Sequence, residues 1–158
     1  MSADADRDVL ELLEYAAARL VERMVGLTDD EWSWRPVPGD PDVSIRWRLD
    51  HVTATLTEER NRTWLGKPTR AEGDSARPVS SAAAARAALG DAIAAFTDLV
   101  RERAGTLGEP IGAVAGPYGD ATRRSFVLHV VDELVHHGAE AALLRDLYAG
   151  GAAGQPST

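Results

Sequence analysis

Apolar residues recur at intervals of three and four along most of this sequence, and this periodicity restricts what the chain can fold into. In residues 7–25 the apolar positions are Val9, Leu13, Ala16, Leu20 and Met24, and residues 44–65, 81–104 and 123–148 show the same spacing. The spacing is typical of amphipathic helices, each of which must bury one apolar stripe. Four such stripes can be buried against one another. We therefore predict an all-α fold, a four-helix bundle.

The connections between these stretches differ in length. Residues 28–31, Thr-Asp-Asp-Glu, have the spacing of a capping box and predict a short helical turn. Residues 66–79 read as an exposed crossover rich in Gly, Pro and charge. Residues 105–122 contain five Gly and two Pro, and a loop this long is more often functional than idle. We expect residues 1–148 to form a single domain and residues 149–158 a disordered tail.

Composition excludes several classes of partner. The 25 acidic residues outnumber the 17 basic ones, so a nucleic-acid partner is not expected. No cysteine is present, so any thiol chemistry must come from a bound small molecule. The first residues resemble no secretory signal and no segment reads as a membrane span, so we expect a cytoplasmic protein without a membrane partner. Lys67 is the only lysine, and this bias toward Arg indicates a GC-rich genome.

The stretch HVVDELVHHGAEAALLRDL, residues 129–147, holds three of the four histidines. In a helix of this sequence His137 falls inside the apolar sector, and Glu133 lies one turn earlier at its edge. A carboxylate directed toward a core is costly unless a cation meets it. A Glu/His pair four residues apart suits a metal ion between helices. The alternative is that His137 is a core histidine and Glu133 its hydrogen-bond partner.

The other titratable residues of this stretch leave open a second choice of metal-binding pair, shifted by one residue. Asp132 and His136 form a rival pair at the same spacing, on a more polar face. His129 and Glu140 lie at the flank of the apolar sector.

The fourth histidine lies in the second predicted helix. His51 follows Trp47 by four residues, so the two rings can stack on one face. Periodicity alone does not decide whether His51 is directed toward the fourth helix.

Two short motifs carry a resemblance to a known family. S-I-x-W-x-x-x-H-V at residues 44–52, followed by E-x-x-x-H at residues 133–137 and then L-L-R-D, resembles the DinB-like superfamily. Its neighbours include the mycothiol-dependent maleylpyruvate isomerases and the bacillithiol transferases. The resemblance covers about residues 7–148 and implies a divalent metal bound by His51, Glu133 and His137. Many members have His where this chain has Glu133, whereas the mycothiol-dependent branch resembles it in using Glu.

The resemblance also implies a chemistry. Two His and one Glu leave an open position on a tetrahedral ion, as in catalytic zinc sites, with nickel or iron as alternatives. The ion would hold mycothiol, which suits an actinobacterial source, as a thiolate that attacks a small electrophile in a transferase or isomerase reaction. Arg145 is the candidate for binding a carboxylate of the thiol or substrate, and Trp47 for a pocket wall. A metal-dependent hydrolase and a non-catalytic metal-binding stress protein are the alternatives. Family members often pair through helix faces, so a homodimer is also compatible with the resemblance.

Overall fold

The computed structural model of this chain describes residues 2–70 and 78–151, with the side chains of residues 4–70 and 78–151. Its helices are α1 (Ser2–Arg23), α2 (Asp29–Ser33), α3 (Ile45–Thr57), α4 (Glu59–Trp64), α5 (Ala82–Arg101), the 3₁₀ helix η1 (Ala113–Tyr118) and α6 (Arg123–Ala149). Between these helices, the described residues contain no strand beyond one isolated bridge that pairs Pro110 with Thr122. The predicted all-α fold is confirmed.

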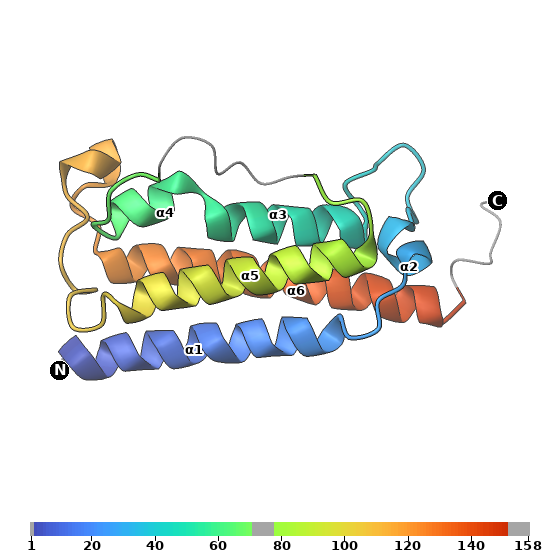
Figure 1. Cartoon of the computed structure of the whole chain (residues 1–158), viewed down its shortest axis with the longest axis horizontal. Helices are drawn as coiled ribbons and strands as arrows, with labels where there is room; N and C mark the ends of the chain where they lie inside the picture. Colours follow the sequence, from blue (N-terminus) through green and yellow to red (C-terminus); the bar gives the residue numbers. More distant parts are fainter. Residues whose placement is uncertain (1, 71–77, 152–158) are drawn as a thin grey trace.

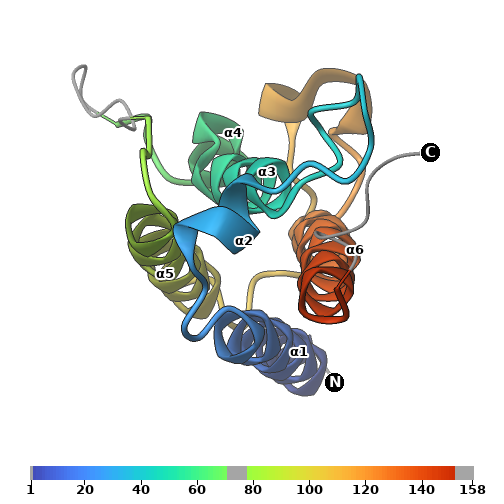
Figure 2. The same ribbon diagram turned by 90° about the vertical axis from the view of Figure 1, so that its right-hand side faces the viewer.

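The four long helices α1, α3, α5 and α6 pack as a bundle. Figure 1 shows that α1 and α6 run in one direction along the bundle, while α3 and α5 run in the other. Seen from the end, α3 lies between α5 and α6, and α1 closes the opposite side (Figure 2). α5 begins at the same end of the bundle as α3, so these two helices run in parallel. No helix in the described ranges is long and apolar enough to cross a membrane.

The core consists of the apolar stripes that the periodicity predicts. Each long helix contributes nearly inaccessible side chains, among them Leu13 and Leu20 of α1, Leu49 and Val52 of α3, Leu89 and Phe96 of α5, and Val127 and Leu134 of α6. The caps are local: the hydroxyl of Thr28 accepts from Glu31 N, and that of Ser81 accepts from Ala84 N. Such caps satisfy amide groups that a helix start leaves without partners.

The structure corrects the bounds of the second predicted helix. Residues 44–65 form two helices, because the chain is extended at Glu58, where φ is −51° and ψ is 137°. The buried side chain of Asn61 donates to Thr55 O at 2.7 Å, so it satisfies a carbonyl at the end of α3. α6 continues to Ala149, the first residue of the predicted tail. Residues 152–158 of that tail lie outside the described residues.

The long loop 105–122 is held to the N-terminal part of α1. The buried carboxylate of Asp6 accepts from Gly105 N at 2.8 Å and from Leu107 N at 3.2 Å. The same carboxylate forms an ion pair with Arg124 at 2.6 Å. Asp6 therefore joins α1, the start of the loop and the start of α6 in one contact.

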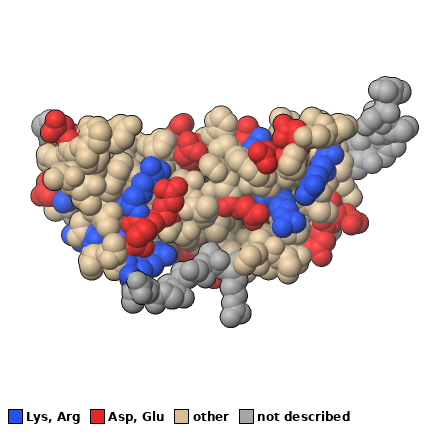
Figure 3. Space-filling view, turned by 90° about the horizontal axis from the view of Figure 1, so that it is seen from above, with Lys and Arg blue, Asp and Glu red and all other residues tan. Residues whose placement is uncertain are grey.

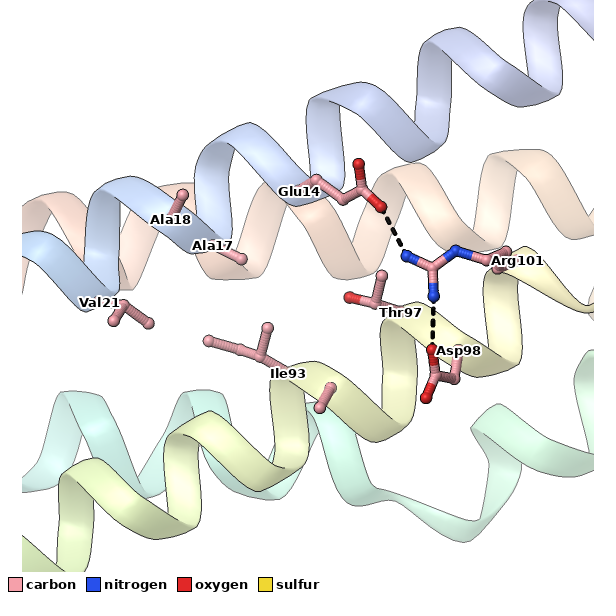
Figure 4. Close-up of a pocket in the computed structure, with 9 residues that line it drawn as sticks. Glu14, Ala17, Ala18, Val21, Ile93, Thr97, Asp98 and Arg101 are labelled. Carbon is pink, nitrogen blue, oxygen red and sulfur yellow. Dashed lines mark hydrogen bonds and ion pairs between the residues drawn. The ribbon is translucent and has the colours of Figure 1, made fainter.

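Several ion pairs join neighbouring helices on the outside of the bundle. Between α1 and α5, Arg101 lies between Glu14 at 2.8 Å and Asp98 at 2.5 Å, and these three residues line part of the pocket shown in Figure 4. On the face shown in Figure 3, basic and acidic side chains are interspersed. Exposed pairs of this kind each contribute little to stability.

Candidate metal centre

The candidate metal ligands come from two adjacent antiparallel helices. His51 lies on α3, whose first turn is fixed by the hydroxyl of Ser44, which accepts from Trp47 N at 3.1 Å. Glu133 and His137 lie one turn apart on α6. Because α3 and α6 pack directly against each other, the three side chains meet between them.

The donor atoms of these three residues lie close together. Glu133 Oε2 is 3.2 Å from His51 Nε2 and 3.4 Å from His137 Nε2, and the two imidazole rings have centroids 4.5 Å apart. One ligand atom from each residue lies within 4.8 Å of the others. Ligands about 2 Å from a tetrahedral zinc ion lie about 3.4 Å from one another. The arrangement therefore fits a single ion with little movement.

The cluster is neither buried nor fully exposed. The side chains of His51, Glu133 and His137 are 35%, 29% and 14% exposed. An ion bound by them would keep one side open to a small molecule.

The electrostatics of the cluster favour the ionised carboxylate. A hydrogen bond from His51 lowers the pKa of Glu133, and the charges of His137 and His129 act in the same direction against the effect of burial. A carboxylate can only accept, so His51 must carry a proton on Nε2 in this contact. A metal ion would take the place of that proton, because ligand histidines bind metals in the deprotonated form.

A second carboxylate orients His137. Glu140 Oε2 is 2.7 Å from His137 Nδ1, which must therefore be the protonated nitrogen. In the neutral ring this leaves the lone pair of Nε2 directed at Glu133. Ligand histidines characteristically donate their other ring nitrogen to a carboxylate in this way. Sequence reasoning placed Glu140 only at the flank, although its position three residues after His137 was the available signal.

Glu140 is itself held by α3. Arg48 Nε lies 2.7 Å from Glu140 Oε2, and the guanidinium of Arg48 lies over the ring of Trp47 at 4.6 Å. Burial raises the pKa of Glu140, but the hydrogen bond from His137 and the charge of Arg48 outweigh it and hold this pKa below its usual value. The carboxylate that orients His137 therefore remains charged at neutral pH.

The alternative metal-binding pair, Asp132 and His136, can be compared with Glu133 and His137 in the structure. His136 is 60% exposed and approaches Glu140 rather than Asp132. His136, His137 and Glu140 form a second close group, but Asp132 joins no group of potential ligands among the described residues. The geometry therefore favours Glu133 and His137 over Asp132 and His136.

Trp47 forms one wall of the cluster. Its ring stacks on that of His51, with centroids 4.8 Å apart and planes 5° from parallel. It also meets the ring of His137 edge to face at 5.6 Å. The predicted stacking of Trp47 on His51 is confirmed, and the contact fixes the orientation of the histidine.

Comparison with known proteins shows the family of this chain. Residues 12–141 match the family model of the DinB superfamily. The chain belongs to the DinB superfamily. A crystal structure of a conserved protein from Enterococcus faecalis is similar to this DinB superfamily chain, with a TM-score of 0.59 and 19% sequence identity. The alignment covers 91% of this chain and 96% of the other. No curated protein matches the sequence significantly.

Arg145 of this DinB superfamily chain is engaged elsewhere in the fold. Its guanidinium pairs with Glu31 at 2.9 Å and donates to the carbonyls of Arg23 and Val25 at 2.6 and 2.8 Å. It lies eight residues beyond His137, or about 12 Å along α6. The acceptors that its guanidinium contacts belong to α2 and the α1–α2 connection, so a role of Arg145 in binding the thiol or substrate stays a prediction.

Loss of the Glu140 carboxylate is expected to weaken metal binding in this DinB superfamily chain. Glu140→Ala should lower the affinity for Zn²⁺ by about 10- to 100-fold, the usual cost of losing a partner that orients a ligand histidine. The number of ions bound per chain should stay at that of the wild type. Titration against a chromophoric chelator measures both quantities. Glu14→Ala, which removes an exposed carboxylate from the α1–α5 pair, is the matched control. Unchanged affinity in Glu140→Ala would contradict the orienting role.

Proposed function

We propose that the chain is a divalent-metal-binding enzyme that activates a low-molecular-weight thiol, mycothiol, for reaction with a small electrophile. The observation that carries this proposal is the convergence of His51, Glu133 and His137 within 4.8 Å on a partly open face. Two imidazole nitrogens and one carboxylate with an open position are the ligand set of a catalytic zinc site. Zinc is therefore the proposed ion.

The chain's own residues have separate tasks in this proposal. His51, Glu133 and His137 would hold the ion, and Glu140 keeps the Nε2 lone pair of His137 directed at the site. Trp47 closes one side of the cluster by packing against both histidines, which limits access of water there. When bound, the ion supplies the positive charge that keeps a thiol in its thiolate form.

Two features of the sequence favour an external thiol. The chain contains no cysteine, so a sulfur nucleophile has to be a bound molecule. Glu133 is at a ligand position where many superfamily members have His. The mycothiol-dependent branch resembles this chain in having Glu there. A small-molecule thiol and an electrophile are therefore the proposed partners.

The test titrates mycothiol, and then glutathione, into metal-loaded and metal-stripped protein. Calorimetry should show mycothiol binding to the loaded form below millimolar concentration and no binding to the stripped form. Loaded protein should also accelerate consumption of a panel of electrophiles only when the thiol is present. Absence of thiol binding to the loaded form at millimolar concentration would contradict the proposal. Ester or amide turnover without thiol would then identify a hydrolase, and absence of turnover would identify a metal-binding protein without catalysis.

A further inference from the structure

A cavity of about 360 Å³ lies between α4, η1 and the first turns of α6. Its lining includes the side chains of Arg60, Trp64, Tyr118, Ser125, Phe126 and His129. We call it the α4–η1 pocket. η1 and α4 contact each other at one end of the bundle (Figure 1). The volume is within the range of pockets that bind small molecules.

The α4–η1 pocket lies next to the candidate metal centre on α6, because His129 of its lining is one turn from Glu133. Phe126, His129, Glu133 and His137 recur at intervals of three and four, so they lie along one side of that helix. His129 precedes Glu133 by one turn, or about 6 Å along the axis. The charge of His129 also acts on the Glu133 carboxylate, which agrees with this short separation. A molecule that contacts His129 would therefore lie about one helical turn from the nearest metal ligand.

Aromatic rings dominate the walls of the pocket. The ring of Trp64 lies 4.9 Å from that of Phe126, inclined by 59°, and 6.1 Å from that of Tyr118, inclined by 41°. Aromatic rings at such separations and angles favour a further flat ring packed against their faces or edges. Tyr118 belongs to the 105–122 loop, so this loop forms part of the pocket wall.

The pocket lining contains one guanidinium and one imidazole. Arg60 and His129 contribute to its lining, and no carboxylate does. The guanidinium of Arg60 lies over the rings of Trp64 and Phe126, at 5.5 and 5.9 Å. Glu58, outside the lining, pairs with Arg60 Nε at 2.6 Å. In the residues that the structure describes, the terminal nitrogens of Arg60 form no ion pair, and a guanidinium presents these to a carboxylate.

We propose that the α4–η1 pocket binds a small aromatic carboxylate, with its ring between Trp64, Phe126 and Tyr118 and its carboxylate at Arg60. This rests on the proposed function in one respect, because the ligand would be the electrophile or its aromatic acid portion, next to the metal-held thiol. The aromatic walls select a flat apolar body, and the cationic lining selects the acid over a neutral analogue.

The binding test uses metal-free protein of the full sequence, with trans-cinnamate and its neutral analogue cinnamamide as probes. Calorimetry or ligand-observed NMR should show cinnamate binding about tenfold more tightly than cinnamamide. Arg60→Gln should remove that difference, and Tyr118→Ala should weaken both probes. Because the side chains of Arg60 and Tyr118 are well exposed, these variants should fold. Equal affinity of the two probes for wild-type protein, or an unchanged preference for cinnamate in Arg60→Gln, would overturn the proposal.

The chain offers a matched control pair in another groove. Arg19 lies over the ring of Tyr15 at 5.7 Å, in the groove between α1 and α6. Tyr15 is 63% exposed, close to the 65% of Tyr118. Arg19→Gln and Tyr15→Ala should leave cinnamate binding unchanged. If these two control variants lost as much cinnamate affinity as Arg60→Gln and Tyr118→Ala, the binding would not be specific to the α4–η1 pocket. That result would overturn the proposal.

A paramagnetic ion separates this proposal from the proposed function. In Co²⁺-loaded protein the proton signals of bound cinnamate should broaden beyond those of the Zn²⁺-loaded form, and His137→Ala should abolish the extra broadening. Bound cinnamate without extra broadening would overturn its placement beside the metal ligands. The protein could bind cinnamate through Arg60 and yet bind no metal ion. That result would support the pocket proposal and contradict the proposed function. Metal and thiol binding without cinnamate binding would remove the pocket proposal alone.

Discussion

Replacing His137 with Ala is expected to lower the affinity for Zn²⁺ by more than about 100-fold, because loss of a direct ligand exceeds the usual cost of losing an orienting partner. His137 is the most buried of the three candidate ligands, with 14% of its side chain exposed. It is also the ligand that Glu140 holds in place. The variant therefore loses both a donor atom and the contact that orients it.

The same variant should lose the stabilisation that the ion confers. At a free Zn²⁺ concentration 1,000 times the wild-type dissociation constant, binding to the folded state contributes about 4.1 kcal/mol. An affinity 100-fold lower reduces this contribution to about 1.4 kcal/mol at the same concentration. Thermal unfolding with and without the ion measures the difference, and elemental analysis of protein purified without a polyhistidine tag measures retention.

His136→Ala is the control, because His136 is its exposed neighbour. It should retain the ion with an affinity within about threefold of the wild type, well below the cost of losing an orienting partner. If His136→Ala lost the ion and His137→Ala kept it, the ligands would instead be Asp132 and His136. Equal retention in both variants would also contradict the site described above.

Asp6→Ala is expected to destabilise the fold by about 3–5 kcal/mol, the cost of breaking a buried ion pair from one side. The Asp6 side chain is 1% exposed, and its carboxylate accepts from two amide groups of the 105–122 loop as well as from Arg124. Removal of the carboxylate leaves those amides without this acceptor. The loss is a large part of the 5–15 kcal/mol that typically stabilises a domain.

Urea and thermal unfolding measure the effect of Asp6→Ala. The midpoint temperature should fall by about 6 °C or more, since each kcal/mol corresponds to about 2–4 °C in a domain of this size. Asp4→Ala is the matched control on the same helix, because Asp4 is 69% exposed and pairs only with Arg7 among the described residues. Its effect should stay within about 0.5 kcal/mol. A similar small effect for Asp6→Ala would show that the loop is anchored by other contacts.

Local patterns accounted for most of the architecture. The three-and-four spacing of residues such as Leu13, Leu89 and Leu134 predicted four helices and their buried faces, and each of these side chains is in the core. Caps such as Ser81 lie next to the groups that they bind. The pair Glu133 and His137 was visible for the same reason, because residues four apart on a helix share a face. Only the family resemblance predicted His51 as the third ligand, because periodicity did not decide which way its side chain is directed.

Contacts between helices decided the rest. The break at Glu58 carries no Gly or Pro signal, and Asn61, beyond the break, donates a hydrogen bond to the end of α3. The partners of Arg145 are more than a hundred residues away in the sequence, so no local pattern predicted these contacts.

The site shows the same division between sequence and tertiary structure. The sequence by itself determined the helices, their buried faces and the Glu133–His137 spacing, because these depend on residues within a turn or two of one another. Only the tertiary structure decided that His51 meets Glu133 at 3.2 Å, that Arg48 holds Glu140, and that the α4–η1 pocket lies beside them. These features depend on the rotation and offset of α3 and α4 against α6, which packing of the whole core sets.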